Sequence, residues 1–299
     1  WHQSFPSEGF EVVVVSNIPA RLELPEYPGM AVLAVQEERP GSYAARNTGI
    51  KYASGDVLAF TDADCVAHPD WLFQGVQPLR FNPLLIVGGP IQIFCQSNRP
   101  SWAERHQMLF AFDHHTNLRL HRGLPTANLF ATRKTFDEVG AFDEELHSGG
   151  DAEWSRRAWR IGLEWHIESE ALVYHPARAT WQDLKNQRRR FASAVSGQRG
   201  IGKKALWLFR WSNPLQLANR IPKSIRKQMT ARDIFGMALI TIGLGGYQAA
   251  LGVRNFFTRD DPHEKGRVSL PARTKQSSPG LGEPLLLHSR NPEKSEAAS

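Results

Sequence analysis

Two carboxylates at the end of a strand-like segment are the residues of this chain best suited to chemistry. Asp62 and Asp64 follow the apolar run 57–61, and the small Ala63 separates them. In extended backbone, residues two apart point the same way, so both carboxylates can face one pocket. Hard divalent cations prefer such oxygen ligands, especially where phosphates complete the shell. The triplet therefore suggests a metal and phosphate site, although acidic residues after a strand more often solvate a turn or cap a helix.

A helix expected over residues 42–53 lies shortly before this triplet. It follows Pro40-Gly41, and Ser42 can cap its N-terminus. The free N–H groups and the positive end of the helix dipole would then favour a diphosphate. Arg46 lies one turn inside the helix and can reach such phosphates, or it can be an ordinary exposed arginine.

Alternating apolar and turn-rich segments predict an α/β fold that positions these groups. Strands are expected at 12–15, 30–35, 57–61, 84–94 and 126–132, and helices at 42–53, 151–161 and 181–199. In the helix 151–161, we expect Trp154, Ala158 and Ile161 to share the buried face. Alternating strands and helices favour a largely parallel sheet whose ligands bind at the carboxyl ends of the strands.

Several motifs in fixed order resemble those of the family-two glycosyltransferases with the GT-A fold. The resemblance covers 41–72, 126–143 and 149–157, ends near Tyr174-His175, and spans roughly residues 10–200. It implies an α/β, three-layer GT-A fold with a mixed, mostly parallel central sheet, followed by C-terminal helices. Family members open with a strand and a helix that we expect to be missing before Glu11, so the residues that bind the nucleotide base stay unassigned.

The resemblance also implies roles at the donor side of the site. Asp62 would contact the ribose or the metal shell, and Asp64 would ligate Mg²⁺ or Mn²⁺. His175 would complete the metal shell, although a lone histidine at a strand end is usually structural. Arg46 and Asn47 would bind the nucleotide part of the donor. A metal in this place neutralises the charge that develops on a departing nucleoside diphosphate.

Asp151 is the expected catalytic base for an inverting transfer, because it occupies the second position of the family's Glu-Asp motif. Gly150 replaces the glutamate of that motif, which removes one carboxylate. Asp151 can instead be the N-cap of its helix, and Glu153 is the alternative base.

Two further residues are expected on the acceptor side of the site. Arg157 matches the downstream arginine of the Glu-Asp motif. Asn128 lies in the segment that lines the acceptor side of the family's pocket, where it would hydrogen-bond a hydroxyl or hold a turn.

Charge is distributed unevenly along the chain. Its formal net charge is +6, yet residues 178–227 hold thirteen Lys/Arg and a single acidic residue. The twenty residues 234–253 that follow carry no charge and are long enough for a bilayer, although their five glycines also suit a buried or interfacial helix. These features favour an anionic membrane surface at the cytoplasmic face. No nucleic-acid motif accompanies the charge, so nucleic acid is not an expected partner.

Three regions are expected along the chain: a GT-A-like domain at 1–200, a basic and apolar membrane-associating helical segment at 201–257, and a disordered tail at 258–299. Cys65 and Cys95 cannot form a disulfide framework, and we expect both to pack in the core. The expected function is transfer of a sugar from a nucleoside-diphosphate sugar to a lipid-linked or polysaccharide acceptor, in cell-surface or exopolysaccharide synthesis. The alternative is a non-catalytic sugar-nucleotide-binding or scaffold protein of the same fold, prompted by Gly150.

Overall fold

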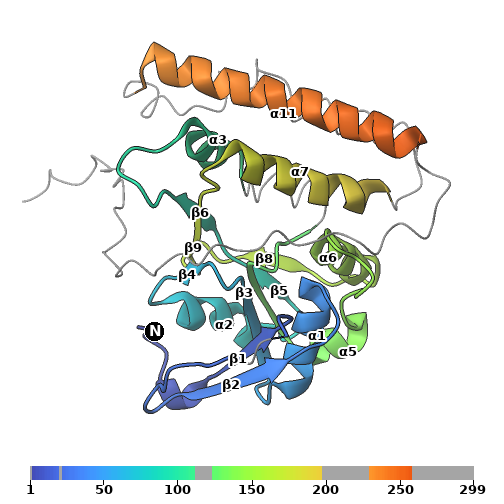
Figure 1. Cartoon of the computed structure of the whole chain (residues 1–299). Coiled ribbons are helices and arrows are strands. Elements are labelled where there is room, and N and C mark those ends of the chain that lie inside the picture. The colour runs from blue at the N-terminus through green and yellow to red at the C-terminus, as the bar shows by residue number, and fades with distance from the viewer. Residues whose placement is uncertain (1, 20–21, 112–122, 197–228, 258–299) are drawn as a thin grey trace, which may run out of the picture. The chain divides into compact units, whose positions relative to one another are not determined.

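The computed structural model (Figure 1) describes residues 2–19, 22–111, 123–196 and 229–257. All of them lie in the unit Trp1–Asp260, and the second unit, Asp261–Ser299, lies outside the described residues. The predicted tail at 258–299 and residues 201–228 of the predicted segment 201–257 lie outside the described residues.

The strands are β1 (Glu11–Ser16), β2 (Ala31–Gln36), β3 (Val57–Thr61), β4 (Val66–Ala67), β5 (Ile86–Gly88), β6 (Ile91–Phe94), β7 (Asn128–Thr132), β8 (Trp165–Ile167) and β9 (Val173–Pro176). The helices are the short η1 (Ser7–Gly9), then α1 (Ser42–Tyr52), α2 (Trp71–Phe81), α3 (Trp102–Phe110), α5 (Arg133–Val139), α6 (Gly150–Arg160), α7 (Trp181–Ser196) and α11 (Ala231–Phe257). Every expected strand and helix has a counterpart in the described part of the chain, although the strand expected over 84–94 is divided into β5 and β6.

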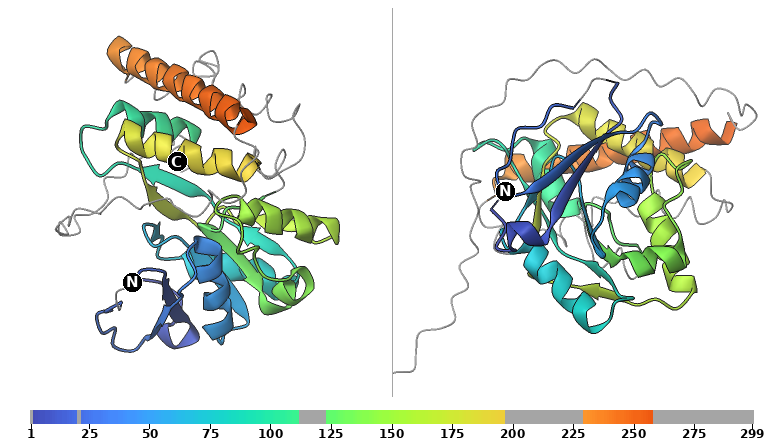
Figure 2. Two further views of the ribbon diagram at one scale, coloured as in Figure 1. Left: turned by 45° about the vertical axis from the view of Figure 1, so that its right-hand side comes forward. Right: turned by 90° about the horizontal axis from the view of Figure 1, so that it is seen from below.

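The strands form three sheets, which Figure 2 shows from two further directions. β1 pairs with β2 in parallel, the central sheet has the order β3-β7-β5-β8, and the third has the order β4-β9-β6. The central sheet is mixed as predicted, but its parallel share is lower than predicted. The reason is that β7 runs antiparallel to both of its neighbours, β3 and β5.

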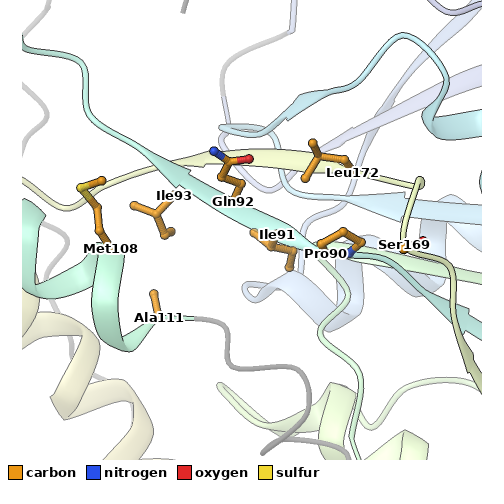
Figure 3. Close-up of a pocket in the computed structure, with 8 residues that line it drawn as sticks. All are labelled: Pro90, Ile91, Gln92, Ile93, Met108, Ala111, Ser169 and Leu172. Carbon is orange, nitrogen blue, oxygen red and sulfur yellow. The ribbon is translucent and has the colours of Figure 1, made fainter. Parts of the chain in front are cut away.

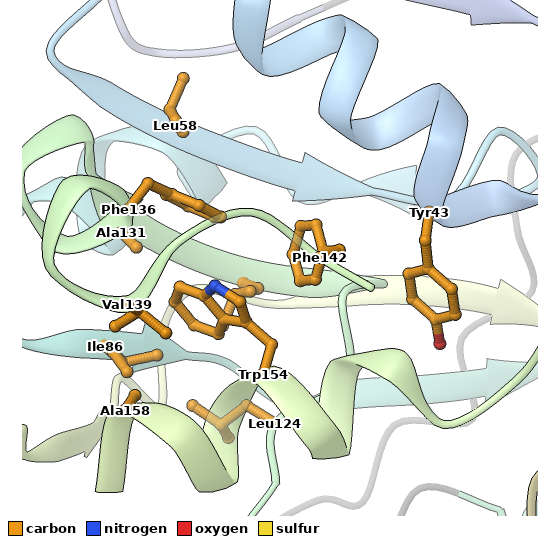
Figure 4. Packing of buried hydrophobic residues seen from close by; sticks show 11 residues of the cluster. Tyr43, Leu58, Ile86, Leu124, Ala131, Phe136, Val139, Phe142, Trp154 and Ala158 are labelled. Carbon is orange, nitrogen blue, oxygen red and sulfur yellow. The ribbon is translucent and has the colours of Figure 1, made fainter. Parts of the chain in front are cut away.

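Alternate residues of the central strands point into two cores on opposite faces of the sheet. On β7, Leu129 and Ala131 enter the larger core, while Phe130 enters the other. Helices α1, α5 and α6 supply the larger core, where Trp154 stacks on Phe136 with ring centroids 4.7 Å apart (Figure 4). Helix α2 covers the opposite face with Trp71. The sheet thus lies between two helical layers.

Three local predictions were wrong. The segment expected as one strand over 84–94 is two strands in different sheets, because Gly89-Pro90 separates β5 from β6. Ser42 is the first residue of α1 rather than its cap, since Gly41 holds the cap position without a side-chain hydrogen bond. Ile161 is 54% exposed because α6 ends at Arg160, one residue before it.

Candidate active site

Strand pairing brings His175 to the acidic triplet, which is far away in the sequence. β9 pairs antiparallel with β4 so that Tyr174 lies opposite Val66, and it pairs in parallel with β6 so that His175 lies opposite Ile93. The short β4 begins directly after the turn that Asp62, Asp64 and Cys65 form at the end of β3. His175 is buried, and its Nε2 lies 3.9 Å from Oδ1 of Asp64.

Four side chains at this junction form a group that can hold a metal ion. The ligand atoms of Asp62, Asp64, Cys65 and His175 all lie within 4.8 Å of one another. Burial, with the charges of Asp62 and Asp64, raises the pKa of the Cys65 thiol to about 12, so without a bound metal the thiol is protonated. Two carboxylates and an imidazole fit a hard or borderline divalent cation such as Mn²⁺. Cys65 and Cys95 are both free and partly buried.

Helix α1 connects the acidic triplet to the expected base on α6. The guanidinium of Arg46 donates to Oδ1 of Asp62 at 2.6 Å and lies 5.4 Å from the centre of the Tyr43 ring. The hydroxyl of Tyr43 donates in turn to Oδ1 of Asp151 at 3.4 Å. Arg46 and Tyr43 therefore connect Asp62 to Asp151.

Asp151 lies in an environment that suits a general base. It is partly buried, and burial raises the pKa of its carboxyl above the ordinary value, with a further contribution from Asp62. The N–H of Ala152, the charge of Arg46 and the Tyr43 hydroxyl oppose that shift. A carboxylate with a raised pKa is a stronger base, so the geometry and the electrostatics agree. The alternative reading of Asp151 as an N-cap was wrong, because Gly149 occupies that position.

The structure gives a physical reason for Gly150, where the family motif has glutamate. A Cβ atom at this position would lie 2.7 Å from the Tyr43 ring. Tyr43 is itself buried in the larger core, where it lies beside Phe142. The Tyr43 ring therefore fills the space that a side chain at position 150 would need.

Sequence reasoning missed Arg178 as well as Tyr43. Arg178 follows β9 by two residues, and its backbone N–H donates to Oε1 of Gln107. Its side chain is largely buried, and Nη1 has no hydrogen-bond partner. The negative charges of Asp64 and Asp62 interact favourably with its guanidinium. Burial lowers the pKa of its guanidinium, which nevertheless stays charged. The sequence signal that could have identified Arg178 is a basic residue three positions after His175, just beyond the same strand.

Asn47, expected to bind the nucleotide, has a structural place instead. Its amide donates to the carbonyl oxygen of Phe142 and to Oε1 of Glu144, both at 2.8 Å, and its Oδ1 accepts from the N–H of Phe142. The side chain is buried and every polar atom is used. The nucleotide role of Asn47 stays a prediction, and the described contacts of its side chain are with the loop 141–146.

Asn128, expected on the acceptor side, is completely buried. Its amide donates to Pro90 and Ala171, and its Oδ1 accepts from Nε1 of Trp71. These hydrogen bonds join β7 to the loops that contain Pro90 and Ala171, and the side chain cannot reach an acceptor in this conformation.

Arg157, the other residue expected on the acceptor side, holds α6 to the preceding loop. Its guanidinium pairs with Glu153 at 2.9 Å and donates to the carbonyl oxygens of Val139 and Ala141 at 2.5 and 2.6 Å. These partners occupy the side chain of Arg157, and Glu153 is held in the same ion pair. The acceptor-side roles of Asn128 and Arg157 stay predictions, and the described contacts of both side chains are set by packing between distant segments.

A pocket of about 530 Å³ with both polar and apolar lining lies along β6, and Figure 3 shows the residues that line it. The lining residues are Pro90, Ile91, Gln92, Ile93, Met108, Ala111, Ser169 and Leu172. None of the predicted site residues is among them, although Ile93 pairs with His175 on the neighbouring strand. The pocket is thus a separate volume next to the strand that carries His175.

Comparison with known proteins supports the resemblance read from the motifs. Residues 5–140 match the family model described as glycosyl transferase family 2. Glycosyltransferase AglE of Haloferax volcanii is 35% identical over 198 residues, which are 62% of this chain and 62% of that protein. The uncharacterized glycosyltransferase YwdF of Bacillus subtilis is 22% identical, over 65% of this chain and 75% of YwdF.

One solved structure with a related fold is the mannosyltransferase PcManGT from Pyrobaculum calidifontis, in complex with GDP-Man and Mn²⁺. It aligns with a TM-score of 0.52 and 17% identity, over 87% of this chain and 81% of that protein. The chain therefore has the GT-A fold, and the predicted resemblance to family-two glycosyltransferases is confirmed.

Proposed function

We propose, for a chain whose residues 5–140 match glycosyl transferase family 2, that it is a metal-dependent glycosyltransferase. It transfers a sugar from a nucleoside-diphosphate sugar to an acceptor hydroxyl and inverts the configuration of the anomeric carbon. The observation that carries this proposal is the connection, through Arg46 and Tyr43, between the metal-binding group at Asp62 and the carboxylate of Asp151.

The proposed reaction assigns one proton transfer to this chain. Asp151 accepts the proton of the acceptor hydroxyl while that oxygen attacks the anomeric carbon. The bond between this carbon and the diphosphate oxygen breaks, and its electron pair leaves with the nucleoside diphosphate. Attack opposite the leaving group inverts the configuration.

Charge on the leaving diphosphate needs positive partners. Asp62, Asp64 and His175 would hold a divalent cation, Mg²⁺ or Mn²⁺, which neutralises this charge when bound. The guanidinium of Arg178, whose Nη1 lacks a partner, is a second candidate for contact with the diphosphate. Arg46 now pairs with Asp62 and supplies further positive charge beside it. The donor side thus combines the predicted ligands with a cation that the sequence did not reveal.

The acceptor is proposed to be lipid-linked or a growing polysaccharide, used in cell-surface or exopolysaccharide synthesis at the cytoplasmic face of the membrane. The basic run 178–227 and the apolar helix α11, which is long enough to cross a bilayer, support a place at an anionic membrane.

Nucleoside diphosphate release, measured over a panel of nucleoside-diphosphate sugars with Mn²⁺, tests the proposal. Asp151→Asn should lower turnover by roughly 10²–10⁴-fold and leave nucleotide binding intact, because it removes only the base. Asp64→Asn should instead weaken Mn²⁺-dependent nucleotide binding. The matched control is Glu153→Gln, since Glu153 pairs with Arg157 and should not affect the chemical step.

Two results would contradict this scheme. Full turnover by Asp151→Asn would remove the base assignment. Donors that bind with Mn²⁺ but are never cleaved, whichever acceptor is present, would favour the non-catalytic alternative.

A further inference from the structure

Helix α11 has an outer face of exposed apolar side chains. Phe235, Leu239 and Ile242 are 62%, 48% and 55% exposed, and Ala249 continues the same row. At 100° per residue, these four positions fall within about 80° of one another around the helix. The sequence from Ile234 to Val253 contains no Asp, Glu, Lys or Arg.

The inner face of α11 carries the polar residues of this stretch. Thr241 and Gln248 are each 1% exposed and share that face with Met237 and Leu244. The hydroxyl of Thr241 donates to the carbonyl oxygen of Met237. A helix on the surface of a water-soluble domain also has an inward apolar stripe, but it carries polar residues on its outer face. The outer row of α11 from Phe235 to Ala249 is apolar instead, which indicates that it meets an apolar environment.

Contacts between glycine and tryptophan hold the inner face against the rest of the unit. Gly236 lies directly against the Trp102 ring of α3, and a Cβ atom at Gly243 would lie 2.8 Å from the Trp181 ring of α7. A helix that left these contacts to cross a bilayer would expose Thr241 and Gln248 to lipid, which is costly for polar groups. A helix that stays in place presents only its outer face.

Basic side chains lie beside the helix. Arg232 is exposed in the first turn of α11. From α7, Arg189 donates a 3.3 Å hydrogen bond to the hydroxyl of Tyr247, and Nζ of Lys185 lies 5.9 Å from the centre of the Tyr247 ring. Apolar side chains that are flanked by cations fit the interface of a membrane with anionic headgroups.

We propose that α11 binds an anionic bilayer as an interfacial helix, with its axis parallel to the membrane plane and Phe235, Leu239 and Ile242 inserted. The proposal goes beyond the proposed function by choosing this mode over a membrane span and by naming the face that inserts. It is tested without donor or acceptor, so a failed transfer reaction and a failed membrane contact can be told apart.

Vesicle sedimentation of the full chain gives the first test. The protein should bind vesicles that contain phosphatidylglycerol more tightly than neutral phosphatidylcholine vesicles. The triple variant Phe235→Ser, Leu239→Ser, Ile242→Ser should bind at least about tenfold more weakly, since three large apolar groups no longer insert. The matched control is Phe81→Ser, because Phe81 is 90% exposed on α2 and should not contribute. Unchanged binding by the triple variant would overturn the proposal.

Depth-dependent quenching distinguishes the in-plane helix from a span. A fluorescent amino acid placed at Phe235 or at Ile242 should be quenched by shallow lipid labels to the same extent in an in-plane helix. In a spanning helix Ile242 would lie near the bilayer centre, about 10 Å deeper than Phe235, and that result would overturn the proposal.

Light scattering of the same variants measures the oligomeric state, and so tests whether a second copy of the chain, rather than a membrane, covers this face. A wild-type dimer that ignores vesicles, and that the triple variant converts to a monomer, would also overturn the proposal.

Discussion

At the scale of single residues, the most informative departure from the family motif is Gly150. The motif glutamate is absent, but the neighbouring Asp151 keeps its place beside Tyr43 and Arg46. The Tyr43 ring occupies the space at position 150, so the replacement is a matter of packing between α1 and α6. The loss of one carboxylate therefore leaves the proposed base in place.

We expect Gly150→Ala to lower the free energy of unfolding by about 1–3 kcal/mol, because its Cβ would overlap the Tyr43 ring. Urea denaturation measures this change. Gly246→Ala is the matched control, since nothing lies within 4 Å of its Cβ position and alanine favours a helix. The Tyr43→Ala variant lacks the ring that causes the overlap, so Gly150→Ala should lower the free energy of unfolding clearly less in that background than in the wild type. Equal costs in both backgrounds would contradict the packing explanation.

The raised pKa of Asp151 predicts a pH-dependent cost in stability. With a pKa above its unfolded value, the folded protein holds this proton more tightly, so stability falls as pH rises from the ordinary carboxyl range through the raised pKa. Asp151→Asn removes this cost, and without divalent cation it should stabilise the protein more at pH 7 than at about pH 4.

Thermal unfolding of the wild type and the variant at several pH values checks this expectation. Asp137→Asn, an exposed position on α5, should show no such trend. If the difference in stability between Asp151→Asn and the wild type stayed constant with pH, the pKa of the Asp151 carboxyl would not be raised in the folded protein. The acid limb of transfer activity should likewise lie above the ordinary carboxyl range, because the base must be deprotonated.

At the scale of elements, strand order and loop anchoring build the site. The pairing of β9 with β4 and β6 places His175 beside Asp64. The loop before α6 is fixed by Arg157, whose guanidinium binds the carbonyl oxygens of Val139 and Ala141. Arg157 is thus a residue of the scaffold that carries Asp151.

Arg157→Gln should destabilise the protein by about 1–3 kcal/mol, since hydrogen bonds from a charged group to two carbonyl oxygens are lost. Arg160→Gln, an exposed arginine on the same helix, is the matched control and should have little effect. Denaturation and acceptor kinetics should be measured on the same preparations. Unchanged stability together with a raised KM for the acceptor would instead support the acceptor role that the motif implied.

At the scale of the whole described unit, α11 carries an exposed row of apolar side chains. Thr241 and Gln248 are buried beside Met237 and Leu244, whereas the outer residues Phe235, Leu239 and Ile242 are exposed. Trp102 of α3 and Trp181 of α7 pack against glycines of the helix. Length and composition alone made 234–253 nearly as suitable for a buried or interfacial helix as for a span. Which face is buried becomes visible only in the assembled unit.

The sequence by itself determined the elements and the centre of the site, because these depend on local patterns. The apolar run 57–61 became β3 with the same bounds, and the predicted helix over 42–53 became α1. Asp62 and Asp64 do lie close together, but in a turn after β3 rather than in the extended backbone that the sequence suggested. Motif order was enough to identify the fold.

Only the tertiary structure decided which polar side chains face the site. Asn47, Asn128 and Arg157 all lie in family motifs, yet each is committed to backbone partners from other elements. Tyr43 and Arg178, which the sequence did not single out, lie next to the site groups instead. The physical reason is that a buried polar group must be hydrogen-bonded, and its partner is set by the packing of distant segments rather than by its neighbours in the sequence.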